Sequence, residues 1–307
     1  MSNFLILIEK IYPLYVIICF GYIAGKFLKV ERDSIAKIAI YFVAPVVVFN
    51  SFATMPKGNT YLLLPVIFFS VAMIIACAYY LVGSKVFTSS ERNLLSASVG
   101  SGNTGYFGIP LILAVFGERY LNIAVISTLG LIIYENTFAY FLISKSEHTL
   151  TTSLKKMAML PSIYTCLFGI IINKSSVTLP ENIVNTITYF RGAYVVLGMM
   201  IVGIALSTVT KASLDIKFGA LAFSAKFIIY PLIISLFIFL DNKYFGLYPQ
   251  RVHEVLLVLS IVPMAANVVS FASHLKVHPE KIAAVVFAST AFALFYLPLF
   301  ISIFISH

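Results

Sequence analysis

LLSASVGSGNTGYFGIPLILAVF, residues 94–116, is the stretch that decides the fold of this chain. It is long enough to cross the hydrocarbon core of a membrane, which takes about 20 helical residues. Its middle nevertheless holds four glycines and a proline: Gly100, Gly102, Gly105, Gly108 and Pro110. Glycine costs about 1 kcal/mol and proline about 3 kcal/mol in a helix interior. The sequence therefore predicts a membrane span that is broken in its middle.

The rest of the chain has the composition of a membrane protein. Of its 307 residues, 60% are apolar and only 11% are charged, whereas soluble proteins are about half apolar and about a quarter charged. Repeated apolar blocks predict an all-α membrane protein of ten transmembrane helices, joined by short connections. We place the spans at residues 5–27, 35–54, 61–83, 94–116, 121–143, 157–173, 183–208, 219–240, 253–275 and 282–304.

The basic residues predict the orientation of the chain. Thirteen of them belong to the odd-numbered connections, namely Lys26, Lys29, Arg32, Lys37, Lys85, Arg92, Lys145, Lys155, Lys156, Lys211, Lys217, Lys276 and Lys281. Six belong to the other side: Lys10, Lys57, Arg119, Lys174, Lys243 and Arg251. By the positive-inside rule, both termini of a protein of the cell (inner) membrane then lie outside. The net charge of +9 is an orientation signal, and no nucleic-acid partner is expected.

The two halves of the sequence resemble each other. A shift of 148 residues aligns Pro13 with Pro161 and Gly21 with Gly169. Further along, a shift of 164 aligns Asn103 with Asn267. Each half holds five spans, an odd number, so the second half enters the membrane from the opposite face. We interpret residues 1–153 and 154–307 as two inverted five-helix repeats, an architecture typical of secondary transporters.

The ninth span is interrupted at the place that corresponds to the break in the fourth. Residues 255–273 read VLLVLSIVPMAANVVSFAS, with Pro263 followed closely by Asn267. Unwound backbone exposes amide and carbonyl groups, and the N-terminus of a half-helix favours an anion. The side chains of Asn103, Thr104 and Asn267 add directional hydrogen-bonding groups. The alternative is that the glycines only allow close helix packing and the prolines only kink the helices.

Several of these stretches are similar to one family of transporters. GNTGYFGIPL at residues 102–111 resembles the fourth span of the auxin efflux carrier family. YFVAPVVVFNSF at 41–52, KFIIYP at 226–231 and VPMAANVVSFASHLKVHPE at 262–280 resemble its second, eighth and ninth spans. The short connection between spans five and six resembles bacterial members, which are associated with malonate, malate and similar organic acids.

The resemblance carries expectations about the fold and the site. It implies that the broken spans four and nine cross near the midplane of the membrane. Spans 1, 2, 6 and 7 would form a scaffold, often a homodimer, and spans 3–5 and 8–10 a transport bundle that moves as an elevator. The implied crossover positions are Asn103, Thr104, Pro110, Pro263 and Asn267. Gly105 and Tyr106, from the same break, complete the candidate substrate-binding set.

Three charged residues, Glu135, Lys226 and Arg191, fall in the interior of predicted spans, where an unpaired charge is costly. Arg191 is close enough to the outer end of the seventh span to extend to the membrane surface. Glu135 in span five and Lys226 in span eight both lie roughly 10 to 12 Å from the cytoplasmic side at 1.5 Å per residue. We hypothesise that they interact, as a structural pair or as a proton-linked switch. The alternative is that Lys226 extends to the membrane surface and Glu135 lines a wet crevice.

These features favour a secondary active transporter for a small organic anion such as a mono- or dicarboxylate. A proton or sodium gradient, or the gradient of the substrate itself, would drive it. No cofactor or metal is expected, since the sequence has no G-x-x-x-x-G-K-[ST] motif for a nucleotide. An enzyme is disfavoured because there is no H-E-x-x-H motif and no mid-span histidine to activate Ser101. The alternative function is a non-transporting sensor or a channel-like protein that binds a small anion.

Overall fold

The computed structural model describes residues 3–58, 60–144, 155, 158–175, 177–207 and 215–305. These residues form helices and turns, and none of them lies in a β-strand. Three basic residues used for the orientation, Lys145, Lys156 and Lys211, lie outside the described residues, as does the predicted repeat boundary at residues 153 and 154. The chain divides into two compact units.

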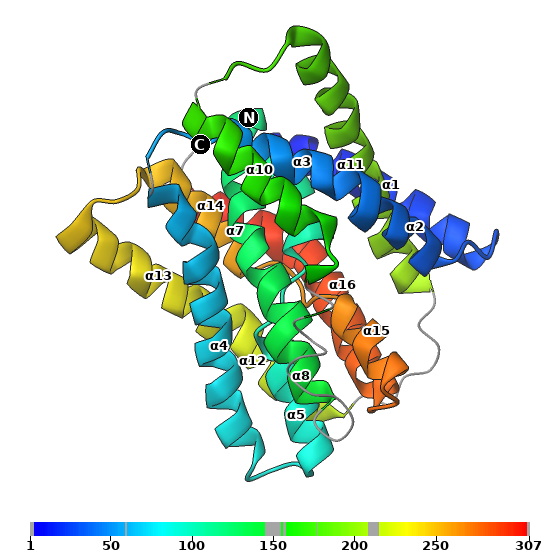
Figure 1. Cartoon of the computed structure of the whole chain (residues 1–307). Coiled ribbons are helices and arrows are strands. Elements are labelled where there is room, and N and C mark those ends of the chain that lie inside the picture. Colours follow the sequence, from blue (N-terminus) through cyan, green and yellow to red (C-terminus); the bar gives the residue numbers. More distant parts are fainter. Residues whose placement is uncertain are drawn as a thin grey trace. The chain divides into compact units, whose positions relative to one another are not determined.

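The first unit holds the described residues of Met1–Leu64, Gly105–Ile126 and Ala158–Thr208. Leu7, Ile11, Leu14 and Ile18 recur at the spacing of one helix face and are buried. Helix α1 packs along α11, and α10 packs along α3 (Figure 1). The elements of this unit are α1 (Asn3–Lys26), α2 (Arg32–Ile38), η1 (Ala39–Val43), α3 (Ala44–Ala53), η2 (Thr60–Leu62), α6 (Ile109–Phe116), η4 (Glu118–Tyr120), α10 (Pro161–Ser175) and α11 (Glu181–Ser207).

The second unit holds the described residues of Pro65–Thr104, Ser127–Met157 and Val209–His307. Its elements are α5 (Ser89–Val99), η5 (Glu135–Ala139), α8 (Tyr140–Ile143), α12 (Ile216–Ser224), η6 (Ala225–Ile229), α13 (Tyr230–Leu240), η7 (Asp241–Phe245), α14 (Gln250–Ser260), α15 (Asn267–His274) and α16 (Pro279–Phe304). Helices α15 and α16 lie side by side (Figure 1). Three elements run from one unit into the other: α4 (Leu63–Gly83), η3 (Thr104–Gly108) and α7 (Leu121–Tyr134).

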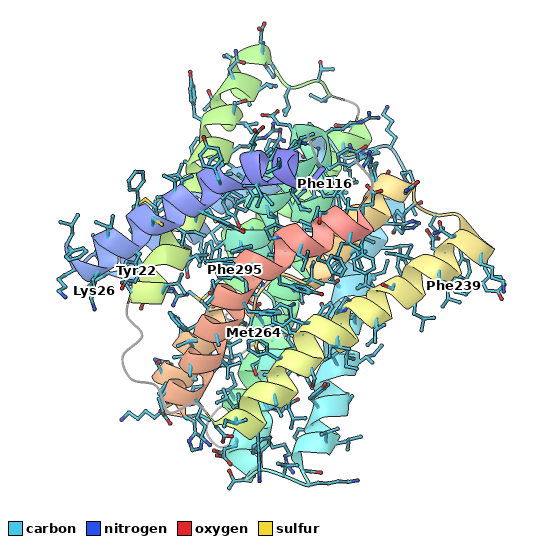
Figure 2. All side chains as sticks on the ribbon, turned by 180° about the vertical axis from the view of Figure 1, so that it is seen from behind. Tyr22, Lys26, Phe116, Phe239, Met264 and Phe295 are labelled. Atoms are coloured by element: carbon cyan, nitrogen blue, oxygen red, sulfur yellow. The ribbon has the colours of Figure 1, made fainter. Side chains whose placement is uncertain are left out.

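Large apolar side chains lie on the outside of the helices. Phe295 on α16 is 81% exposed and Phe239 on α13 is 57% exposed (Figure 2). Tyr189 on α11 is 79% exposed. Soluble proteins rarely expose so much apolar surface, whereas lipid accepts it. The chain is a multi-pass membrane protein.

Eight helical segments of the described residues are long and apolar enough to cross a membrane, compared with the ten spans predicted. The sixth predicted span contains α10, which has only 15 residues. The ninth is divided between α14 and α15, which have 11 and 8 residues. Neither of these two predicted spans is among the eight segments, so the number ten stays a prediction.

Candidate functional site

The fourth predicted span is broken where its glycines are concentrated. Helix α5 ends at Val99, and regular α-helix resumes only at Ile109, the first residue of α6. Between them lie a non-helical segment and the π-helical turn η3, Thr104–Gly108. Pro110 stands in the first turn of α6 and cannot donate to the carbonyl of Tyr106, which lies in the middle of η3.

The ninth predicted span is also broken, and at the predicted place. Helix α14 ends at Ser260 and α15 begins at Asn267, with Pro263 in the non-helical segment between them. This segment is buried, and its Met264 lies among the side chains of the second unit (Figure 2). The backbone amide of Met264 donates to Ser289 Oγ on α16 at 3.2 Å. Neighbouring side chains therefore satisfy part of the opened backbone, as the membrane interior requires.

The two breaks meet within the second unit. The backbone amide of Asn103 donates a hydrogen bond of 2.8 Å to the carbonyl oxygen of Pro263. The Asn103 residue is only 7% exposed. Its side-chain amide nevertheless makes no hydrogen bond to another described residue. A nearly buried amide with free donors and acceptor is suited to hold a polar ligand.

Glu135 lies beside this junction on the π-helical turn η5. The residue is 3% exposed, and its Oε2 accepts a hydrogen bond from Asn267 Nδ2 at 3.0 Å. The backbone amide of Gly102 also hydrogen-bonds to the Glu135 carboxylate. Through these two contacts, one carboxylate links the broken fourth span to the first residue of α15. Asn267 thus orients Glu135 in this structure.

Lys226 also lies close to Gly102, on the π-helical turn η6. The side chain is 0% exposed, and its ammonium makes no hydrogen bond within the described part of the chain. The Nζ atom is 4.3 Å from the centre of the Tyr230 ring. A Cβ placed on Gly102 would lie 2.6 Å from this Nζ. Gly102 therefore leaves the space that the ammonium occupies.

Glu135 and Lys226 interact electrostatically, as the sequence predicted, but not through a hydrogen bond. The two side chains make no direct hydrogen bond, because Lys226 Nζ has no hydrogen-bond partner in the described residues. Lys226 does not reach the membrane surface either, and Glu135 does not line an open crevice, since both are buried. They act on each other by longer-range electrostatic attraction. Their role in coupling or in structure stays a prediction.

The predicted binding set is divided between the two units. Asn103, Thr104, Pro263 and Asn267 belong to the second unit, together with Glu135 and Lys226. Gly105, Tyr106 and Pro110 belong to the first unit. There, both Gly105 and Tyr106 lie near helix α11. A Cβ on Gly105 would lie 3.1 Å from the Tyr194 hydroxyl. A Cβ on Gly198 would lie 3.1 Å from the Tyr106 carbonyl.

Sequence reasoning missed two features of the second unit. Tyr230 is fully buried next to Lys226, and the turns that carry Glu135 and Lys226 are π-helical rather than α-helical. Such turns are frequent at functional sites. Pro231 was a usable signal for η6, because a proline cannot donate to the carbonyl four residues before it. No proline follows η5 at that spacing.

Comparison with known proteins gives two matches that cover nearly the whole chain. A family model described as membrane transport protein matches residues 6–154 and 148–301. An uncharacterized transporter of Methanocaldococcus jannaschii is 27% identical over 293 residues, which are 91% of this chain and 92% of that relative. Both helix breaks lie inside the residues that the family model matches.

Proposed function

This chain belongs to the membrane transport protein family, and on that premise we propose that it is a secondary active transporter for a small organic anion. The family and the relative point to a membrane transporter rather than to an enzyme. The substrate in our proposal is a mono- or dicarboxylate, bound where the two broken helices meet. A proton or sodium gradient, or the gradient of the anion itself, drives transport.

One observation carries the proposal: two predicted spans are broken, and their breaks touch in the second unit through the Asn103 amide and the Pro263 carbonyl. Broken helices at membrane depth are tolerated only where protein, water or ligand satisfies the backbone. In secondary transporters such breaks mark the binding site for substrate and coupling ion. The free side-chain amide of Asn103 supplies directional hydrogen bonds to a carboxylate.

The proposal includes ten spans in two inverted repeats. Gly21 and Gly169, aligned by the shift of 148, have equivalent surroundings. A Cβ on Gly21 would collide with the Met200 carbonyl of α11, and one on Gly169 with the Phe49 carbonyl of α3. Each glycine thus allows a helix of one half to pack closely on a helix of the other.

An elevator motion is the mechanism that we propose for alternating access. The first unit contains the helices of predicted spans 1, 2, 6 and 7, which supports its role as the scaffold, and it also contains Gly105–Ile126. The second unit contains most of spans 3–5 and 8–10 and would carry the anion. We further propose that the scaffold forms a homodimer in the cell (inner) membrane, with both termini outside.

Reconstituted transport tests the proposal. The full chain in phospholipid vesicles is assayed for uptake of labelled malonate, malate, lactate and indole-3-acetate, with pH, sodium and voltage gradients imposed separately. Saturable uptake with counterflow of at least one anion is expected. A channel-like protein gives no counterflow, and a sensor binds an anion without moving it.

Asn103→Ala tests the location of the site. Its backbone bond to Pro263 is kept, so the fold should survive, while one or two ligand hydrogen bonds are lost and the KM rises roughly tenfold. Asn185→Ala on the exposed face of α11 is the matched control. Unchanged kinetics in Asn103→Ala would place the substrate elsewhere.

A further inference from the structure

Two buried hydrogen-bond donors of the second unit lack an acceptor. Lys226 Nζ and Tyr230 Oη make no hydrogen bond to any described residue, and both residues are 0% exposed. They are four residues apart, in η6 and at the start of α13, with the ammonium 4.3 Å from the Tyr230 ring centre. Buried donors are almost always paired in proteins, because an unmade hydrogen bond is costly. Two such donors together indicate an acceptor that binds during the working cycle.

The polar side chains next to these donors hydrogen-bond to other groups instead. The Glu135 carboxylate accepts from Asn267 Nδ2 and from the Gly102 amide. The Tyr134 hydroxyl donates to the carbonyl oxygens of Ser96 and Ala97, at 3.2 and 3.1 Å. The titratable groups that interact electrostatically with Glu135 are Lys226, Tyr230 and Tyr134. Its hydrogen-bond partners, Asn267 of α15 and Gly102 of the broken fourth span, do not titrate.

We propose that Lys226 and Tyr230 bind the carboxylate of the transported anion, and that Glu135 takes up one proton with it. This inference rests on the proposed function and adds the anion clamp and the coupling ion. The clamp lies beside the proposed site, since Lys226 Nζ lies against Gly102, the residue that precedes Asn103. Both donors are closed off from solvent in this conformation, so entry of the anion requires movement of the surrounding elements.

Charge balance gives the reason for the proton. Without substrate, the cluster holds one carboxylate and one ammonium, whose charges cancel. An entering carboxylate adds a negative charge, which is unfavourable at membrane depth. If Glu135 accepts a proton from water on the same side, it becomes a neutral carboxylic acid, and the ammonium then neutralises the substrate carboxylate. On release the anion leaves Lys226 and the proton leaves Glu135, so one proton crosses with each carboxylate.

The clamp is tested with variants that remove one donor each. Full-length Lys226→Met and Tyr230→Phe are each reconstituted into phospholipid vesicles. Uptake of labelled malonate and lactate is then measured for both variants. The KM is expected to rise roughly tenfold or more for Lys226→Met, which loses a charge-assisted bond, and severalfold for Tyr230→Phe. Lys243→Met and Tyr189→Phe, at exposed positions, are the matched controls. Size-exclusion profiles and melting temperatures verify that each variant is folded.

Proton coupling is tested with Glu135→Gln, which imitates the protonated carboxyl group. Wild-type vesicles should accumulate lactate when the outside is acidic, and a membrane potential alone should not drive this electroneutral uptake. Glu135→Gln should keep lactate exchange but lose accumulation against a gradient, whereas Glu181→Gln, on the exposed end of α11, should behave as wild type.

The outcomes distinguish failure of the clamp and proton coupling from failure of the proposed transport function. If the wild type transports an anion but both clamp variants keep its KM, or if Glu135→Gln still accumulates lactate, the inference is overturned and the proposed function stands. Sodium-driven uptake that ignores the pH gradient also overturns it. If the wild type transports none of the four anions, the proposed function itself fails.

Discussion

At the scale of single residues, Gly102 determines how two buried charges are placed. Its amide hydrogen-bonds to Glu135, and its missing side chain leaves room for the Lys226 ammonium. In the sequence Gly102 was one of several glycines in a broken span, and nothing distinguished it from Gly105 or Gly108. Its importance follows from the approach of a side chain that lies 124 positions further along the chain.

Gly102→Ala is expected to move the Lys226 ammonium without unfolding the protein. A new Cβ would lie 2.6 Å from Nζ, and the far end of a flexible lysine can yield. Displacing this donor should raise the KM for the transported anion roughly tenfold. Gly192→Ala is the control, because no described residue lies within 4 Å of its Cβ position and alanine favours the helix by about 1 kcal/mol. Equal kinetics in the two variants would contradict the packing argument.

A second buried charge cluster joins the beginning of η7 to the beginning of α14. Asp241 is 0% exposed and accepts hydrogen bonds from the amides of Leu247 and Tyr248, at 2.9 and 3.2 Å. Its Oδ2 also lies 2.7 Å from His253 Nε2. One carboxylate therefore holds the connection between two helices of the second unit.

Asp241→Ala should destabilise the protein by about 3–5 kcal/mol, because two backbone amides and a buried histidine lose their acceptor together. Thermal unfolding in detergent measures the effect. Glu280→Ala serves for comparison, since that carboxylate is 52% exposed and lies 3.8 Å from His278; it should cost less than about 1 kcal/mol. A similar melting temperature for both variants would argue against a structural role for Asp241.

At the scale of elements, three of the π-helical turns end two residues before a proline. They are η1 before Pro45, η3 before Pro110 and η6 before Pro231. A proline has no N–H for the carbonyl four residues earlier and its ring clashes with that carbonyl. In each case that carbonyl belongs to the middle of the π-helical turn. The prolines therefore account for where these three turns lie.

Pro231→Ala is expected to return η6 towards regular α-helix, because the restored N–H can donate to the Phe227 carbonyl. A π-helical turn holds one residue more than an α-helical turn, so its conversion to α-helix rotates the preceding helix by about 100°. Lys226 would then leave Gly102, so transport should fall even though the helix gains stability. Hydrogen exchange of the Phe227 to Pro231 region and anion uptake measure the two effects. Pro279→Ala, in the first turn of α16, should change neither.

The sequence and the structure agree best where local chemistry is decisive. Pro110 and Pro263 predicted the two breaks, since proline acts on its own helix whatever surrounds it. The meeting of Asn103 with Pro263 and the place of Lys226 beside Gly102 join residues more than 100 positions apart, and no local pattern encodes such contacts. The π-helical turn η5, which carries Glu135, has no proline after it and left no signal of this kind.

Three helix starts of the second unit are joined by one lysine. Lys281 on α16 bonds to Glu91 in the first turn of α5, and at 3.0 Å to Asp215, the N-cap of α12. The Phe218 amide and the Lys281 ammonium lower the pKa of Asp215 below its ordinary value of 3.8. A carboxyl group of this kind adds stability above its ordinary pKa and loses it as the pH falls through the lowered value.

Asp215→Ala should therefore cost about 1 kcal/mol at neutral pH through loss of the cap. Asp215→Asn keeps a capping oxygen and loses only the charge, so its cost should be smaller. The stability difference between wild type and Asp215→Asn should shrink below about pH 4, as Asp215 becomes protonated. Melting temperatures across a pH series check both points, and a difference that grows on acidification would contradict the assignment.

At the scale of the whole molecule, the compact units do not follow the halves of the sequence. Each unit takes segments from both sides of residue 153, and the break in the fourth span divides between them after Thr104. Consecutive residues Asn103 to Tyr106 therefore belong to different units. In the proposed elevator motion, this irregular stretch is one of the places where the chain passes from one unit to the other, together with α4 and α7.

Membrane orientation is the prediction that concerns the chain as a whole. The thirteen basic residues of the odd-numbered connections predict that the first connection lies on the cytoplasmic side of the membrane. The connection after α10 is then predicted to lie on the outer side. Cysteines at Ser34 and Ser175, both exposed, probe these two places. In a background with Cys19, Cys77 and Cys166 replaced by alanine, an impermeant maleimide added to intact cells should label Ser175→Cys and not Ser34→Cys. Permeabilised cells should label both. Labelling of both positions in intact cells would break the ten-span topology, because an odd number of crossings must separate them.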